Sequence, residues 1–326
     1  MSKIIIGIHG LGNKPPGSVL KKWWKQSIGE GLRTIGHTRL LFNFELVYWA
    51  GYLHEEPLNP DEKNPHDPHY EDEPYVHSKG YVKKEPSIFR KKILDYIEKQ
   101  MDRIFLNEDM SINYSFVTDF IIHHFFRDLD IYYYSDCVLK CKSDLTAKKI
   151  IRDYMASILE KHRGKEILLI AHSMGSIIAY DVLTLSVPDI KIDTFVTIGS
   201  PLGLPVVMGK IAQEQKAHGK RVRHVRTPEN IVRNWYNFSD LKDKITFNYN
   251  LGDDYGKNSH HIQPVDREVY NDYEYNGKKN PHKSYGYLRT PELAEVINDF
   301  LNRDRSRTMI WLDEKINNLM SRFLSL

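Results

Sequence analysis

Short, almost uninterrupted apolar runs alternate along the chain with longer segments in which apolar side chains recur every three or four residues. Residues 4–8 and 166–171 are runs of the first kind, and each predicts a strand that is buried on both faces. Residues 18–31 and 145–162 are segments of the second kind, and their spacing predicts amphipathic helices. Strands that alternate with helices predict an α/β fold with a doubly wound, mostly parallel sheet.

The remaining apolar segments extend this pattern, and one long polar segment interrupts it. We expect further strands over 39–49, 195–198 and 235–238, and a helix over 291–301. Residues 51–85 are rich in Pro, His, Asp, Glu and Tyr and show little periodicity. This composition predicts a long irregular insertion rather than a strand or a helix.

The last segment of the chain, 303–326, again has helical spacing. Met309, Leu312, Ile316 and Leu319 are among the apolar residues on one of its faces. Its mixed charge favours docking on the body of the protein, while pairing with a second copy of the chain and contact with a membrane surface are the alternatives. The sequence therefore predicts a C-terminal amphipathic helix, which is a candidate contact for a homo-oligomer.

Composition narrows the class of protein. The chain has 326 residues, 41% of them hydrophobic and 27% charged, and we expect a single domain over 1–326. A net charge of +3 without a dense Lys/Arg block argues against nucleic-acid binding. We expect no transmembrane segment and no signal peptide, because long apolar runs are missing and the first residues enter a strand at once. With only two cysteines, the expected protein is reduced, soluble and cytoplasmic.

The strand over 166–171 leads into the clearest chemical signal of the chain. Ser173 follows it, with the small residues Ala171 and Gly175 two positions before and after, and an apolar helical segment comes next. A sharp strand-to-helix turn with serine at its apex is a nucleophile elbow, in which small flanking residues relieve the crowding. The alternative for Ser173 is a simple helix N-cap.

A nucleophilic serine needs a base within hydrogen-bond reach and a carboxylate that orients the base. His282 precedes the last amphipathic helix of the sheet, and this position favours it as the base over the other histidines. Asp243 follows the strand over 235–238 and is our candidate for the acid, with Asp240 in the same loop as the alternative. The order Ser, Asp, His is the one expected for a triad that starts at such an elbow.

The developing oxyanion needs two main-chain donors. The amides of Met174, directly after the serine, and of Leu11, in the glycine-containing loop after the first strand, are the candidates. A phosphate-binding loop is the alternative for this segment, but Pro15 stands where the third glycine of that fingerprint belongs. We expect His9, Gly10 and His172 to border the substrate, with His9 supporting the loop rather than acting as the base.

These motifs resemble the serine α/β-hydrolases, especially the lipase and esterase branch, whose elbow reads A-H-S-M-G and whose oxyanion loop begins H-G. The resemblance covers the first strand and its loop, residues 163–202, the loop that carries the acid, and the segment from His282 to Leu301, which is about a third of the chain. It implies Ser173 as nucleophile, His282 as base, Asp243 as acid, and Leu11 and Met174 as oxyanion donors. Residues 199–203, Gly-Ser-Pro-Leu-Gly, are also similar to the strand end that follows the nucleophile in these lipases.

The resemblance leaves residues 50–140 unexplained, since the distance from His9 to Ser173 is long for this family. We expect this insertion, with its helical segment 88–105 and its apolar segment 116–126, to form a cap or lid over the site. His66 and His69 have a spacing that suits metal ligands, but no companion cluster completes the set, so we expect no metal and no cofactor.

The expected activity is hydrolysis of a small-molecule ester or lipid by a serine esterase or lipase-like enzyme. Two alternatives remain open at this point. The same residues serve acyl transfer and peptide cleavage, because fold and triad do not fix the substrate. The fold can also serve as a binding or scaffold module without catalysis, with the insertion and the C-terminal helix as partner surfaces.

Overall fold

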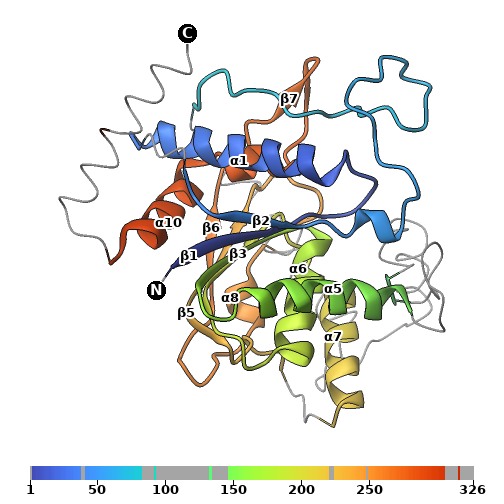
Figure 1. Ribbon diagram of the computed structural model, residues 1–326. Coiled ribbons are helices and arrows are strands. Elements are labelled where there is room, and N and C mark those ends of the chain that lie inside the picture. Colours follow the sequence, from blue (N-terminus) through green and yellow to red (C-terminus); the bar gives the residue numbers. More distant parts are fainter. Residues whose placement is uncertain are drawn as a thin grey trace.

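A computed structural model describes residues 2–37, 41–82, 92, 132–133, 146–219, 224–246, 249–304 and 315. Its centre is a six-stranded sheet in which all five neighbouring pairs run parallel (Figure 1). In spatial order the strands are β2 (Phe44–Val47), β1 (Lys3–Ile8), β3 (Glu166–His172), β4 (Ile192–Ile198), β5 (Ile231–Ser239) and β6 (Pro264–Glu268). The predicted parallel α/β fold is confirmed.

Both faces of the sheet are buried, as the continuous apolar runs predict. Successive side chains of β1 alternate between two cores: Ile4, Ile6 and Ile8 belong to one, and Ile5 to the other. The β3 strand divides in the same way, with Leu169 among the residues on the first side and Leu168 on the second. This period of two follows from the strand geometry, and it explains why these strands contain hardly any polar residue.

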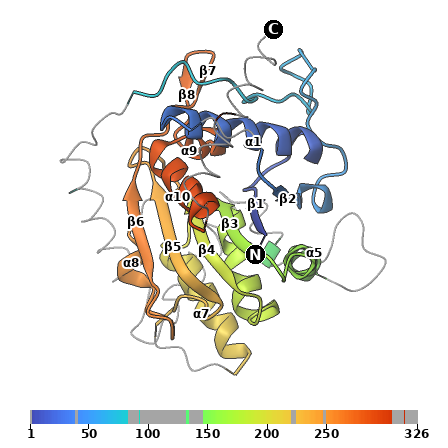
Figure 2. The ribbon, with the colours of Figure 1, turned by 60° about the vertical axis from the view of Figure 1, so that its left-hand side comes forward.

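Helices cover the two faces as separate layers (Figures 1 and 2). One layer contains α1 (Gly17–Thr34), α9 (Ser284–Leu288) and α10 (Pro291–Asn302). The other contains α5 (Ala147–Lys161), α6 (Met174–Asp181) and α7 (Pro205–Ala217), with the π-helical turn η2 (Val182–Ser186) continuing α6. The sheet is therefore doubly wound, as the alternation of strands and helices predicts.

The strand order reverses beside β1. From β1 the chain moves outward to β2, and it then returns to the other side of β1 to form β3. The loops that leave the carboxyl ends of β1 and β3 consequently diverge, and such a switch point opens a crevice in which ligands bind. The loop of β1 begins at His9, and the loop of β3 contains Ser173.

Several elements differ from the prediction. The β2 strand is only Phe44–Val47, much shorter than 39–49, whereas β5 extends over Ile231–Ser239 instead of 235–238. The amino-terminal half of β5 contains the polar residues Arg233 and Asn234, so it has no continuous apolar run that would predict a strand. The helix α7, the edge strand β6 and the hairpin of β7 (Glu274–Tyr275) with β8 (Lys278–Lys279) were not predicted.

Residues 54–82, which we call the strap, are the described part of the expected insertion after the short η1 turn (Ala50–Tyr52). The strap has no helix and runs past α1 toward the β7–β8 hairpin (Figure 1). It is fixed by bonds to distant residues: Tyr75 Oη donates to Glu30 (2.6 Å), and Tyr273 Oη donates to the carbonyl of Pro74 (2.7 Å). This irregular segment is therefore docked on the body of the domain.

Other predicted features lie outside the described residues. The rest of the expected cap, with its segments 88–105 and 116–126, is among them except for Lys92, Tyr132 and Tyr133, and so is nearly all of the expected helix 303–326. Within the part of the chain that is described, no helix combines the length and apolar character needed to cross a bilayer. The same part contains no group of three or more His, Cys, Asp or Glu residues suited to a metal ion.

Candidate active site

Ser173 occupies a strained turn between β3 and α6. Its φ of 52° and ψ of −131° are unusual for a residue with a side chain, and its amide donates to the carbonyl of Ile198 at the end of β4 (3.1 Å). The helix passes so close to β1 that a Cβ at Gly175 would lie 2.6 Å from the carbonyl oxygen of His9. A strained residue persists only where its surroundings determine it, and such residues cluster at functional sites. The turn is a nucleophile elbow in its geometry.

His282 and Asp243 complete a chain of hydrogen bonds that begins at this serine. His282 Nε2 lies 3.0 Å from Ser173 Oγ, and His282 Nδ1 lies 2.8 Å from Asp243 Oδ2. A carboxylate accepts only, so Nδ1 carries the proton and Nε2 is left to accept from the serine hydroxyl. The three residues come from the turn after β3, the loop after β5 and the segment before α9.

The structure distinguishes the two candidate acids. Asp243 accepts the Ile245 amide through Oδ1 (2.9 Å) and presents Oδ2 to His282. The carboxylate of Asp240 instead accepts the amides of Lys242 (2.7 Å) and Asn271 (2.8 Å). Asp240, the alternative acid, therefore does not orient the base, and its bonds hold the loop together. Burial raises the pKa of the Asp240 carboxyl above its ordinary value, while the amide bonds of Asn271 and Lys242 oppose that rise.

The segment that carries His282 is clamped on both sides of the imidazole. The side-chain amide of Asn271 donates to the carbonyls of Pro281 (2.8 Å) and Lys283 (2.9 Å). The His282 amide donates to the side chain of Asn280 (2.9 Å), whose amide group in turn donates to Glu73 of the strap. The base is thus placed by residues from the β5–β6 side of the sheet and from the strap.

His172 lies beside His282, and its surroundings disfavour the charged form of its imidazole. Its Nε2 donates to the carbonyl of His282 (2.8 Å), because a carbonyl can only accept, and the two rings are 4.9 Å apart. Burial, followed by the repulsion of a charged His282, holds the pKa of His172 well below its ordinary value. His172 borders the cavity, as expected, and its bond to the main chain of the base makes it a support of that segment.

His9 orients the loop that follows β1. Its Nε2 accepts the amides of Trp49 (3.0 Å) and Ala50 (3.3 Å), so its proton is on Nδ1, which donates to the carbonyl of Gly10 (2.8 Å). The carbonyl of Gly10 and the amide of Leu11 belong to one planar trans peptide and point in opposite directions. Fixing the carbonyl therefore fixes the direction of the Leu11 N–H. His9 borders the cavity, but its ring nitrogens are engaged by the main chain.

Lys14 closes the same loop from the other side. Its ammonium group donates to the carbonyls of Leu11, Gly12 (3.0 Å) and Asn13 (3.2 Å). Gly10 lies directly against the nucleophile, since a Cβ there would approach Ser173 Cβ to 2.6 Å. Met174 is the first residue of α6, and the first amides of a helix have no partner within it. The amides of Leu11 and Met174 thus flank the serine on ordered main chain.

A cavity of about 340 Å³ opens onto these residues. On one side α1 contributes Leu20 and Trp24, and on another the strap contributes acidic side chains, Glu71 among them. Lys283 borders the cavity beside the base, and its ammonium group pairs with Glu71 (3.6 Å) and Glu73 (3.3 Å). The cavity is therefore lined by apolar side chains from α1 and by acidic side chains from the strap.

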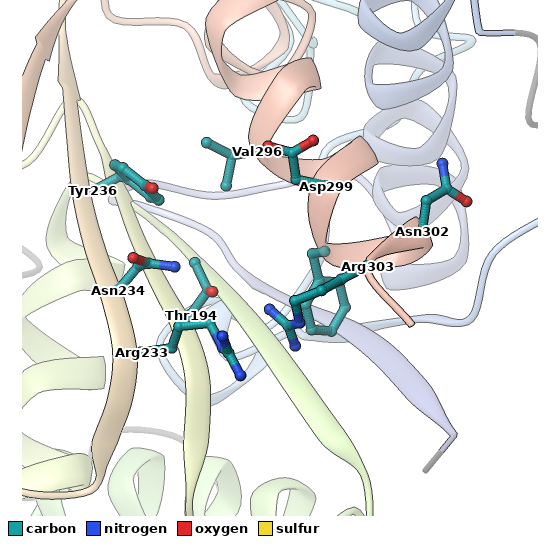
Figure 3. Close-up of a pocket in the computed structure, with 9 residues that line it drawn as sticks. Thr194, Arg233, Asn234, Tyr236, Val296, Asp299, Asn302 and Arg303 are labelled. Atoms are coloured by element: carbon teal, nitrogen blue, oxygen red, sulfur yellow. The ribbon is translucent and has the colours of Figure 1, made fainter. Parts of the chain in front are cut away.

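A second, larger cavity of about 520 Å³ lies between α10 and the amino-terminal halves of β4 and β5 (Figure 3). Arg233 and Arg303 direct their guanidinium groups toward the same region of it. Both groups pair with the buried carboxylate of Asp193, at 3.2 Å from Arg233 Nε and 2.7 Å from Arg303 Nη2, and Arg303 also contacts Glu166 (2.8 Å). These ion pairs neutralise the two cations, and none of the described residues that line this cavity is a serine, a cysteine or a histidine.

Sequence reasoning brought together Ser173, His282 and Asp243, which the structure finds in contact. It missed the residues that hold the site: Asn271, Asn280 and Glu73 around His282, Lys14 in the loop after β1, and Tyr287, whose hydroxyl donates to Asp243 Oδ2 (2.8 Å). The only signal for Lys14 was its place in the loop after the first strand, and nothing in the local pattern marks the others. Their partners are far away in sequence, as the bond of Asn280 to Glu73 illustrates.

Comparison with known proteins supports the fold and covers the segment around Ser173. The protein-family model described as "PGAP1-like alpha/beta domain", a serine α/β-hydrolase-like family, matches residues 99–226. The matched segment contains Ser173 and its elbow but ends before Asp243 and His282. A search of curated proteins gives no match to the chain. The parallel sheet with helices on both faces fits the serine α/β-hydrolase superfamily.

Proposed function

We propose that the protein is a serine hydrolase that cleaves carboxylic esters through Ser173, His282 and Asp243. The observation that carries the proposal is the unbroken chain of bonds from Ser173 Oγ through the imidazole (3.0 Å) to the Asp243 carboxylate (2.8 Å). It begins at a serine in a strained elbow and ends at a carboxylate whose side chain is fully buried. The hydrolase-like family match over the elbow points to the same class of enzyme.

In the proposed reaction, His282 Nε2 removes the hydroxyl proton as Ser173 Oγ attacks the ester carbonyl. Asp243 stabilises the imidazolium that forms and keeps the ring in the tautomer that can accept at Nε2. The imidazolium then protonates the leaving alcohol, and an acyl-serine remains. Water, deprotonated by the same imidazole, attacks the acyl group and releases the acid.

The amides of Leu11 and Met174 are the proposed oxyanion donors. The bond from His9 to the Gly10 carbonyl aims the Leu11 amide, and the start of α6 leaves the Met174 amide without a helical acceptor. Donors fixed in advance cost no reorganisation when charge develops on the carbonyl oxygen, and one such donor contributes on the order of 10²–10³ in rate. The proposed substrate is a small-molecule ester or lipid whose acyl group enters the cavity above Leu20 and Trp24.

Labelling by a fluorophosphonate tests the nucleophile without any knowledge of the substrate. The wild type is expected to be labelled covalently and Ser173→Ala not at all, because the reagent reacts only with an activated serine. Ser27→Ala is the matched control, since Ser27 is a buried serine whose hydroxyl bonds within α1. Equal labelling of the wild type and Ser173→Ala would contradict the proposal.

A chain-length series of p-nitrophenyl esters then tests the reaction class. Turnover that disappears in Ser173→Ala supports ester hydrolysis. Acyl transfer and amide cleavage use the same three residues, so an added acceptor alcohol and a peptide panel separate these activities from hydrolysis. A protein that is neither labelled nor active on any panel would instead be a binding module with a hydrolase fold.

A further inference from the structure

Tyr287 contacts Asp243, the acid of the proposed triad, in the interior of the protein. It belongs to α9, five residues after the base, and its side chain is fully buried. The hydroxyl donates to Asp243 Oδ2 (2.8 Å), the same oxygen that accepts from His282 Nδ1 (2.8 Å). The hydroxyl oxygen in turn accepts the Asp240 amide (2.9 Å). The Asp240 amide therefore donates to the tyrosine hydroxyl, and this hydroxyl and the imidazole both donate to the carboxylate, so that two series of hydrogen bonds converge on Asp243.

The direction of this chain follows from hydrogen-bond chemistry. A main-chain amide only donates and an ionised carboxylate only accepts, so the tyrosine hydroxyl must accept from the first and donate to the second. Accepting a bond at its oxygen makes a hydroxyl a stronger donor, because neighbouring hydrogen bonds polarise one another. Burial and the neighbouring Asp243 carboxylate raise the pKa of Tyr287 well above its ordinary value, so the hydroxyl keeps its proton.

The space around Asp243 Oδ2 is too crowded for the side chains of Asp243, Tyr287 and His282 to change conformation freely. Gly199, at the end of β4, has a φ of +55°, and a Cβ there would lie 3.1 Å from Asp243 Oδ2, 3.1 Å from Tyr287 Cε2 and 3.2 Å from His282 Nδ1. Carboxylate, imidazole and phenol thus fill the space beside a residue that carries no side chain. The carboxylate has little freedom to rotate away from either donor.

We propose that Tyr287 is a positioning residue of this site, which holds the Asp243 carboxylate aimed at His282. The inference rests on the proposed function and adds the residue that sets how strongly the acid binds the imidazolium. A carboxylate that shares its charge with a second donor attracts the imidazolium proton less strongly. The hydroxyl therefore sets the pH at which the base becomes free to act.

A substitution at Tyr287 leaves the other charged and titratable groups near His282 unchanged. His172 faces it from the end of β3, Lys283 adjoins it in sequence, and Lys14 approaches from the loop after β1. On the other side, Glu71 and Glu73 of the strap pair with Lys283. None of these groups is altered by a change at the phenol of Tyr287.

The test compares Tyr287→Phe with the wild type in the rate of fluorophosphonate labelling across pH 5 to 9. The variant keeps the ring and loses the donor to Asp243. The acidic limb of its pH profile is expected to move to higher pH by roughly half a unit, and its plateau rate is expected to fall about tenfold because the imidazole is less well oriented. Tyr255→Phe is the matched control, since Tyr255 is equally buried but its hydroxyl donates to the carbonyl of Leu202 (2.9 Å).

A second variant is expected to shift the acidic limb of the pH profile in the opposite direction. Incorporation of 3-fluorotyrosine at position 287 strengthens the hydroxyl as a donor and keeps the rest of the chain of bonds, so the acidic limb is expected to move to lower pH. The 3-fluorotyrosine variant tests the role of Tyr287 even if Tyr287→Phe does not fold. Opposite shifts of the two variants, with Tyr255→Phe on the wild-type curve, support the proposal.

A merely structural role would lower the rate of both variants without moving either limb, and that result would overturn the inference. The proposed function fails separately. If the wild type is not labelled, or if Ser173→Ala is labelled equally, there is no triad for Tyr287 to position. If the wild type is labelled through Ser173 and both limbs stay in place, only the role of Tyr287 is refuted.

Discussion

Two cavities lined by described residues lie toward opposite ends of the sheet, and the smaller of the two holds the candidate chemistry. The cavity at the carboxyl ends has a volume of about 340 Å³ and contains Ser173 and His282. The cavity beside the amino-terminal halves of β4 and β5 has about 520 Å³ and contains Arg233 and Arg303 (Figure 3). Of these two cavities, the larger one is therefore not the one that holds the candidate chemistry.

The difference lies in how each end handles its polar groups. At the amino-terminal end, Arg233 and Arg303 share the buried carboxylate of Asp193, and Arg303 also pairs with Glu166, so two positive and two negative charges cancel within one set of ion pairs. At the carboxyl end, each hydrogen bond is donated in the same direction, from the Ser173 hydroxyl, which faces a cavity, to His282 and from His282 to Asp243. A closed set of ion pairs serves stability, whereas an open-ended chain of donors can deliver a proton.

The largest expected effect contrasts the two acids of the carboxyl end. Asp243→Asn presents an amide to His282 Nδ1, which favours the wrong imidazole tautomer, and kcat is expected to fall by about 10⁴-fold. Asp240→Asn is the matched control three residues earlier, since its carboxylate bonds main-chain amides rather than the base. Steady-state hydrolysis of the best ester in the series measures both. Equal losses in the two variants would show that the Asp243–His282 contact carries no special role.

How much of this difference the sequence can predict depends on how far apart in the sequence the interacting residues lie. The buried strands β1 and β3 and the turn at Ser173 have local sequence patterns, and these patterns predict the two strands and the turn that the structure shows. The sequence does not predict the edge strand β6, because Pro264–Glu268 has one exposed face and three consecutive charged residues, Asp266 to Glu268, after Val265. A short strand of this kind is indistinguishable from a polar loop until its neighbour β5 is known.

The supports of the site depend on contacts that no local pattern encodes. Asp240 and Asp243 stand in the same polar loop, and the directions of their side chains follow from its turn geometry. Tyr287 is one of 20 tyrosines in the chain, and from sequence it reads as an ordinary core residue. Glu73 belongs to a strap that lacks periodicity, and its partner Asn280 lies 207 residues away. Such residues become recognisable only when the fold brings the segments together.

At the amino-terminal end, the comparison predicts a loss of stability without a loss of activity. Arg303→Met removes the closer partner of Asp193, whose carboxylate is largely buried, and the free energy of unfolding is expected to drop by about 1–2 kcal/mol. Arg233→Met is the matched variant in the same cavity, and its loss should be below about 1 kcal/mol because the Arg233 side chain is half exposed. Urea unfolding followed by circular dichroism gives both values. A fall in fluorophosphonate labelling in either variant would argue that the two ends are coupled.

The smallest predicted effect concerns the stability of the carboxyl end in acid. The folded protein disfavours the charged form of His172, whose pKa lies well below the ordinary value of 6.5. The unfolded chain takes up a proton near that value, so this contribution to stability is fully present above it and is lost as the pH falls below it. The cost is at most about 1.4 kcal/mol for each pH unit.

His172→Gln isolates this contribution, since glutamine does not titrate and its amide can still donate to the carbonyl of His282. The unfolding free energy of the wild type should fall more steeply than that of the variant between pH 6.5 and pH 5. At pH 8 the histidine is neutral in both the folded and the unfolded chain, so the difference measured there reflects packing alone. Parallel pH profiles for the two proteins would mean that the folded site accommodates a charged His172, and the neutral support assigned to it beside the base would have to be abandoned.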